Sequence, residues 1–449
     1  MLSEKDAKHI LRECLRLSPA EGTEAALSGG NVSLVRFVEN EIVLPFNEKR
    51  EQLFLRVLDK GRIGRASVDR FDGRAIKAAL NLALKAARAQ PLLREKYSFP
   101  PPRKILDVNG YDSPSAQLSV EEMMLKISGL LELFRKKGIR GYGVLSKKTG
   151  SINASYGWPF GGERMYAIAN SEGLFAYHKS TALHFSVTLK TQEAEAWHEV
   201  SGLKISGMDF KRIGEDSVKK VLAAKKLQVL DPGDHTVIFE PAAVAAMLSG
   251  IGKMFLAESA ARPSSPFYGK LGERIFGTNI TLSDDHTNNL LQNCPFSSEG
   301  VPRRKKILIS EGRVNDLIYS KREAQEKGME PDGYDLPFPG LAGRGHYDED
   351  KPVSLCLAGG KSSMQELIAS SKKAVVVTGF WGNIANEGSL LVRNGKVTGA
   401  LKGFYIKQDA LQLLRNAELL GRQERISNSF FTSVSAFPAI KASGVKCSI

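Results

Sequence analysis

The fold of this chain is decided by the stretch ITLSDDHTNNLLQNCPFSSEGVPRRKKILISEGRVNDLIYS, residues 280–320. Alternating apolar runs flank a long polar loop that contains Asn, Ser, Pro and Gly, and the second run ends at the turn Glu311–Gly312. Short apolar runs separated by Gly, Pro and Asp are typical of consecutive antiparallel strands joined by specific turns. The stretch therefore predicts a β-rich region in the second half of the chain.

The rest of the sequence predicts an α+β protein with two domains. The predicted helices cover residues 4–16, 73–89, 120–137, 215–228, 241–260, 363–370 and 408–416. The predicted strands of the first half cover residues 31–44, 51–58, 62–68, 142–157, 162–170 and 173–190. We expect a two-layer α/β N-terminal domain, residues 1–228, followed by a β-rich antiparallel, barrel-like C-terminal domain, residues 229–449.

Local signals support several of these boundaries. Ser3 precedes Asp6 by three residues, and Ser119 precedes Glu122 by three, which is the spacing of a capping box at a helix start. Asp59-Lys60-Gly61 lies between two apolar runs and predicts a hairpin turn.

Composition limits the classes of partner. With 449 residues, of which 42% are apolar, the chain can form two domains with their own cores. Its formal net charge of +14 suits an acidic partner. The dense basic run 303–306, however, accompanies no helix-turn-helix, zinc-finger or RNP-like pattern. Because charge alone gives only non-specific affinity, we expect no nucleic-acid partner.

Cysteine usage and hydropathy indicate the compartment. The four cysteines, Cys14, Cys294, Cys356 and Cys447, show no CxxC spacing, which is typical of a reducing environment. The sequence MLSEKDAKHI at the start lacks the apolar core of a signal peptide, and no run of 18 apolar residues occurs. We therefore expect a cytoplasmic protein without membrane association.

The order of residues in the opening stretch is more specific than a generic turn pattern. Asp284-Asp285 ends the first run, Glu299-Gly-Val-Pro precedes the basic residues, and Glu311-Gly312 follows Ile-Leu-Ile. The segment 269–272, Gly-Lys-Leu-Gly, precedes this stretch. In these features the chain resembles the TldD/PmbA family, also called modulators of DNA gyrase, whose members behave as metalloprotease subunits.

The resemblance also implies where a metal would be expected. Metal-bearing members, the TldD type, carry His-Glu-x-x-x-His on the helix after a Glu-Pro step, so that two His reach one zinc and the Glu polarises its water. Here the step is Glu240-Pro241, and the following AAVAAMLSGIGKMFLAESAA contains no His and only one acid, Glu258. The chain therefore resembles the PmbA type, also called TldE, and we expect no cofactor in this chain, with zinc or a similar metal on the partner subunit.

The resemblance implies a function that depends on a complex. In the family, a metal-bearing and a metal-free subunit form a heterodimer that cleaves unfolded or short peptides. Our hypothesis is that this chain is the metal-free subunit and that its partner is a TldD-type paralogue. Two alternatives remain: a self-sufficient homodimeric peptidase, and a non-catalytic protein that binds peptides or an acidic partner.

Four charged residues of the opening stretch are candidate substrate- or partner-binding residues: Asp284, Asp285, Glu299 and Arg303. Asp284, Asp285 and Glu299 have the chemistry to bind a cation or to act as acid and base. In the alternative interpretation they cap a turn and pair with Arg303 and Arg304, as acids in ordinary ion-pair networks do. We expect no catalytic residue and no metal ligand in this chain.

A second candidate region is the aromatic segment TGFWGNIANEGS, residues 378–389. Trp381 and Asn383, placed between glycines and small residues, would suit the wall of a peptide cleft. The alternative is that the aromatic residues pack in the core.

Overall fold

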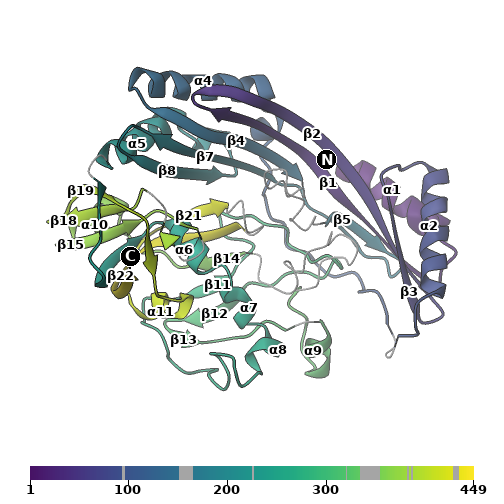
Figure 1. The fold of residues 1–449 in the computed structure, drawn as a ribbon. Helices are drawn as coiled ribbons and strands as arrows, with labels where there is room; N and C mark the ends of the chain where they lie inside the picture. Colours follow the sequence, from purple (N-terminus) through teal and green to yellow (C-terminus); the bar gives the residue numbers. More distant parts are fainter. Residues whose placement is uncertain are drawn as a thin grey trace.

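The structure of the protein, a computed structural model, contains two β-sheets with helices packed on them (Figure 1). It describes residues 1–93, 97–150, 165–224, 227–319, 321–333, 354–381, 384–385, 388–427 and 434–448. Within these ranges helices combine with mainly antiparallel strands, which confirms the predicted α+β class. No helix in the described ranges is long and apolar enough to cross a membrane.

The first sheet has eight strands in the order β3-β2-β1-β4-β7-β8, with β5 paired to β1 and β6 to β5. Its strands are β1 (Gly22–Val38), β2 (Glu41–Asp59), β3 (Arg62–Val68), β4 (Arg140–Gly150), β5 (Met165–Asn170), β6 (Phe175–Tyr177), β7 (Thr181–Lys190) and β8 (Glu195–Gly202). Its helices are α1 (Glu4–Leu17), α2 (Gly73–Arg88), α3 (Ser113–Gln117), α4 (Val120–Lys136) and α5 (Phe210–Ala223), with a 3-10 turn at Ile205–Gly207. Two apolar clusters bury the sheet, one under α4 and α5 and one under α1 and α2.

The long hairpin β1–β2 differs from the prediction of a single strand over residues 31–44. The chain reverses at Glu39 and Asn40, which both have positive φ, 51° and 65°. Asn tolerates this left-handed conformation, and the Asn40 side chain also donates to Ile139 O and accepts from Gly141 N, each at 2.8 Å. The turn contains no Gly or Pro, so the sequence carries only a weak signal for it.

The predicted helix starts and the second hairpin turn are confirmed. Ser3 caps α1 by accepting from Asp6 N, and Ser119 and Glu122 form a capping box at α4. Lys60 and Gly61 both have positive φ and join β2 to β3. These features depend only on residues close in sequence.

The second sheet has 14 strands and branches at β22, which pairs with β10, β14, β20 and β21. Its strands are β9 (Leu227–Gln228), β10 (Gly233–Phe239), β11 (Leu282–Asp284), β12 (Lys306–Ser310), β13 (Arg313–Val314), β14 (Leu355–Leu357), β15 (Lys373–Val377), β16 (Phe380–Trp381), β17 (Ile384–Ala385), β18 (Leu390–Arg393), β19 (Lys396–Leu401), β20 (Phe404–Ile406), β21 (Ala417–Ser427) and β22 (Val434–Ser448). Its helices are α6 (Pro241–Met247), α7 (Ile251–Met254), α8 (Ala257–Ala260), α9 (Lys321–Glu326), α10 (Met364–Ala369) and α11 (Ala410–Arg415).

The helix predicted over residues 241–260 is wrong as one element, because the chain forms three short helices there. Gly250 separates α6 from α7, and glycine is costly inside a helix. Before α8 the backbone becomes extended at Leu256, and Ala257 N donates to Ile318 O at 2.8 Å. Pairing with a distant segment therefore replaces the helical hydrogen bonds.

A buried arginine connects the two sheets. Arg56 of β2 is 4% exposed and pairs with Glu24 of β1 at 2.9 Å and with Glu299, between β11 and β12, at 2.8 Å. Tyr97 and Phe99 place their rings about the same guanidinium, with centroids 5.5 and 5.4 Å away. Because two carboxylates and two rings surround it, this cation holds the loop of the second sheet against the first.

Two buried histidines lie near this junction. His178 joins β6 to β7 and is 7% exposed, while His286 follows β11 and is 3% exposed; the Nε2 atoms of both have no hydrogen-bond partner in the described ranges. Burial lowers the pKa of each histidine to about 4. At His178 the charge of Asp107 opposes this shift. At His286 the charge of Arg303 adds to the shift and that of Asp285 opposes it.

Removing the junction cation should destabilise the protein strongly. We expect Arg56→Leu to lower the free energy of unfolding by about 3–5 kcal/mol, because Glu24 then stays buried without its partner. Arg16→Leu, which removes an exposed ion pair with Glu13, is the matched control and should cost less than about 1 kcal/mol. Urea unfolding of the full chain measures both, and equal losses would contradict the role of Arg56.

Acid should destabilise the protein through the two histidines. Between the unfolded pKa of about 6.5 and the folded pKa of about 4, the unfolded chain binds more protons, so stability falls as pH falls. The slope is about 1.4 kcal/mol per pH unit for each group, and it ends below pH 4.

The variant His178→Gln/His286→Gln should flatten this dependence, measured as unfolding free energy between pH 4 and 7. His9→Gln, at an exposed position of α1, is the control and should leave the slope unchanged. A double variant with the wild-type slope would show that the two histidines do not cause it.

Candidate functional site

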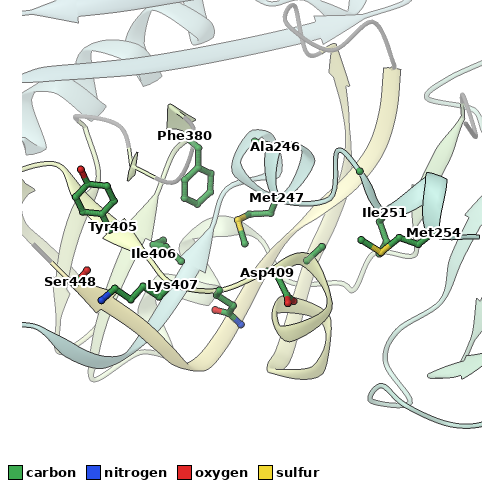
Figure 2. Close-up of a pocket in the computed structure, with 13 residues that line it drawn as sticks. Ala246, Met247, Ile251, Met254, Phe380, Tyr405, Ile406, Lys407, Asp409 and Ser448 are labelled. Atoms are coloured by element: carbon green, nitrogen blue, oxygen red, sulfur yellow. The ribbon is translucent and has the colours of Figure 1, made fainter. Parts of the chain in front are cut away.

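A pocket lies beside the helices that follow the Glu240-Pro241 step (Figure 2). Helix α6 begins here because Glu240 is extended and Pro241 occupies the first turn, where no backbone N–H is needed. Val244 is fully buried in the core below the helix. The pocket side of α6 and α7 consists of Ala246, Met247, Gly250, Ile251 and Met254.

The opposite wall comes from distant parts of the chain. It consists of Phe380 of β16, Tyr405 and Ile406 of β20, residues 407–410, and Ser448 of β22. The Phe380 ring is held by stacking on the buried Phe239, with ring centroids 6.2 Å apart. The cavity has a volume of about 660 Å³, which is in the range of small-ligand sites.

The pocket is apolar at its helical wall and polar at its rim. Lys407 and Asp409 are its charged residues and both are exposed. Zinc in proteins is bound by His, Cys or carboxylate side chains, and none of these occurs on the pocket side of α6 and α7. No group of three or more His, Cys, Asp or Glu that could hold a metal occurs among the residues that the structure describes. The residues of this wall therefore do not fit a metal site.

The C-terminal cysteine lies next to the pocket in sequence but has an unreactive environment. Cys447 precedes Ser448, is 4% exposed and lies in the main apolar cluster. Burial raises the pKa of its thiol to about 12. A thiol of this kind stays protonated at neutral pH and is a poor metal ligand.

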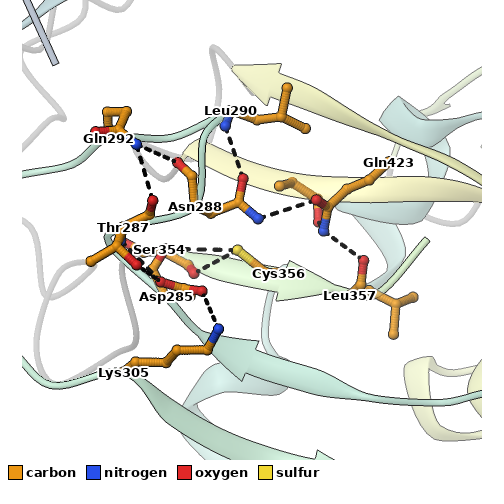
Figure 3. A network of polar contacts seen from close by, with 11 residues as sticks. Asp285, Thr287, Asn288, Leu290, Gln292, Lys305, Ser354, Cys356, Leu357 and Gln423 are labelled. Atoms are coloured by element: carbon orange, nitrogen blue, oxygen red, sulfur yellow. Dashed lines mark hydrogen bonds and ion pairs between the residues drawn. The ribbon is translucent and has the colours of Figure 1, made fainter. Parts of the chain in front are cut away.

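The candidate acids Asp284 and Asp285 make structural contacts, and those of Asp285 are drawn in Figure 3. Asp284 Oδ1 accepts from Ser354 N at 2.9 Å, which holds β11 against β14. Asp285 pairs with Lys305 at 2.8 Å and accepts from the Thr287 hydroxyl at 2.6 Å. Burial raises the pKa of Asp285, but Lys305 and Thr287 lower it more, so this pKa lies below its ordinary value.

The other two charged candidates lie in separate surroundings. Glu299 pairs with Arg56 of the first sheet, and Arg303 Nε donates to Phe296 O at 3.2 Å. The alternative interpretation, in which the acids pair with Arg303 and Arg304, is wrong for the described ion pairs. Asp285 pairs with Lys305, and Glu299 pairs with Arg56. The acids therefore contact different partners and do not converge on one ion.

The aromatic segment contributes to the pocket through a neighbour of the predicted residue. Asn383 lies outside the described residues, and Trp381 is placed only as a backbone position of β16 opposite Ile384. Phe380, one residue earlier, lines the pocket.

Met247, Met254 and Gln408 line the pocket, and sequence reasoning did not select them. Met247 ends α6 and Met254 ends α7, and their spacing in the sequence is equally typical of core packing. Gln408 stands in the short segment between β20 and α11 and belongs to no motif.

Comparison with known families places the chain. The model of the PmbA/TldA metallopeptidase central domain matches residues 146–225, and that of the C-terminal domain matches residues 232–448. Together these matches cover more than half of the chain. The chain therefore belongs to the PmbA/TldD family of metallopeptidases.

Individual proteins also resemble this chain in sequence or in fold. The crystal structure of TldE from Thermococcus kodakarensis superposes with a TM-score of 0.82 at 21% identity, over 98% of this chain and 99% of that chain, which establishes a shared fold. A metalloprotease of Methanothermobacter thermautotrophicus is 22% identical over 237 residues, 49% of this chain and half of the relative. An uncharacterized protein of Methanocaldococcus jannaschii is 22% identical over 370 residues, 78% of this chain and 80% of the relative.

Proposed function

We propose that this chain is the metal-free subunit of a TldD/TldE-type metalloprotease that degrades or processes unfolded or short peptides. The catalytic metal, zinc or a similar ion, then belongs to a TldD-type partner in a heterodimer. The observation that carries the proposal is the apolar wall of α6 and α7. Where the metal-bearing type has two His and a Glu, this chain has residues such as Ala246, Met247 and Met254 facing a pocket.

The homodimeric alternative would need ligands from Asp284, Asp285 and Glu299. Each of these carboxylates already has a protein partner: Ser354 N, Lys305 and Arg56 respectively. Releasing Glu299 would leave Arg56 buried without one of its two acids, which is costly. These contacts favour a metal-free subunit that acts with a metal-bearing partner over a self-sufficient peptidase.

A non-catalytic peptide-binding protein would use the same pocket to bind peptides but would not take part in their cleavage. The two functions therefore differ in whether a metal-bearing partner converts binding into cleavage. In the proposed complex, backbone pairing with an extended peptide would give low sequence preference, while the apolar pocket would favour certain side chains.

Co-expression with the TldD-type paralogue of the same organism tests the proposal. We expect a stable complex that contains stoichiometric metal and cleaves an unfolded polypeptide, with cleavage lost on chelation. The chain purified alone and dialysed against metal-free buffer should contain only substoichiometric metal and should cleave nothing.

Two results would oppose this assignment. Retention of close to one metal equivalent by the isolated chain, with cleavage, would favour the homodimeric peptidase. Absence of a complex, together with peptide binding by the isolated chain, would favour the non-catalytic binder.

A further inference from the structure

The side-chain amide of Gln408 is buried at the pocket without a hydrogen-bond partner. Its Oε1 and Nε2 atoms are both inaccessible, and neither has a partner in the described ranges. Buried amides are rarely left unsatisfied, because losing the hydrogen bonds to water is costly. The backbone on either side is engaged, since Lys407 N donates to Lys446 O at 2.9 Å and Asp409 caps α11. Because both atoms lack accessible surface, the amide can contact a ligand only if the side chain turns toward the cavity, and it gives up no hydrogen bond of the described ranges when it does.

A side-chain amide has one acceptor and one donor group that point in nearby directions. A ligand that satisfies both must itself carry a donor and an acceptor side by side. One residue of an extended polypeptide has this pattern, because its own N–H and C=O point to the same side of the strand. A hydrocarbon, or an anion with acceptors only, would leave one atom of Gln408 unpaired.

The rest of the pocket indicates which side chain accompanies this backbone. Met247 and Met254 are flexible and polarisable, so they adapt to apolar groups of different shape. Phe380, stacked on Phe239, gives a rigid aromatic wall. A charged side chain between the methionines and Phe380 would lose hydration without meeting an opposite charge. The charged residues of the pocket, Lys407 and Asp409, are exposed at its rim.

The rim does not provide a good site for a free amino acid. Asp409 is the acid at the rim, and its carboxylate already accepts from Gln412 N at 2.8 Å in the α11 cap. An α-ammonium group would compete with that cap, whereas the neutral backbone of a peptide would not. The chemistry therefore favours a residue within a chain over a free zwitterion.

From these observations we infer that the pocket binds one large apolar residue of an extended polypeptide. When the Gln408 side chain turns toward the cavity, the N–H of the bound residue donates to Gln408 Oε1 and its C=O accepts from Gln408 Nε2. The bound side chain then lies between the methionines and Phe380. The inference deepens the proposed function by giving this subunit its own preference for apolar residues, but it concerns binding by the chain alone.

Fluorescence anisotropy with the full chain and labelled Ala-Ala-Leu-Ala-Ala-amide measures this binding directly. We expect the Leu peptide to bind at least about tenfold more tightly than the same peptide with Asp at the centre, since burying a Leu side chain is strongly favourable. Free leucine should compete poorly. Equal binding of the Leu and Asp peptides, or equal competition by free leucine, would overturn the inference.

The role of Gln408 is tested by pairing a variant with a modified peptide. N-methylation of the central Leu removes its N–H and should weaken binding to the wild type several-fold. Gln408→Leu should itself weaken binding by about tenfold, the loss expected for two neutral hydrogen bonds. It should also make binding insensitive to N-methylation, which identifies a direct contact. Equal sensitivity in wild type and variant would overturn the assignment of Gln408.

Matched substitutions control for general effects on the fold. Met247→Asp should abolish binding of the Leu peptide, while Met329→Asp, at an exposed position, should not. Gln325→Leu, on the exposed surface of α9, is the control for Gln408→Leu. If Met247→Asp does not fold, the Gln408→Leu comparison decides the question. Failure of peptide binding while the complex with the TldD-type partner forms would reject this inference and leave the proposed function standing.

Discussion

The buried guanidinium of Arg56 is the interaction on which the arrangement of the two sheets depends. Its partners come from three places: β1, the aromatic segment before α3, and the loop between β11 and β12. A cation in such surroundings tolerates little displacement, because moving it away deprives the carboxylates of Glu24 and Glu299 of their shared compensating charge. Phe296, beside that loop, packs with Ala26 and Phe54 of the first sheet and adds apolar contact at the same junction. The loop that carries the candidate residue Glu299 therefore also connects the two sheets.

A candidate functional site is better supported at the pocket beside α6, α7 and α11. The segment after Glu240-Pro241, where the resemblance implies the metal motif of the TldD type, is broken here at Gly250, and its short helices present methionines to a cavity. The same scaffold that would position a metal can thus position an apolar side chain. Members of one family can keep a fold while their sites differ, because function resides in side chains placed on the fold.

Features stabilised by residues close in sequence were predicted correctly, whereas features stabilised by residues distant in sequence were missed. The cap at Ser3, the capping box at Ser119 and Glu122, and the turn at Lys60-Gly61 all depend on residues a few positions apart, and each was predicted. The reversal at Glu39-Asn40 was missed because its stabilising contacts reach Ile139 and Gly141, about one hundred positions away. The broken helix after Pro241 was missed for the same reason, since Ile318 takes the hydrogen bond of Ala257.

The sequence by itself determined the family resemblance, the α+β class and the absence of His from the segment after Glu240-Pro241, because these are properties of residue order and local periodicity. Only the tertiary structure decided which charges pair and which side chains share a cavity. Glu299 meets Arg56 across 243 positions, and Met247 meets Phe380 and Gln408 in one pocket. Such pairings follow from how strands and helices pack against one another, and no local pattern of residues encodes that packing.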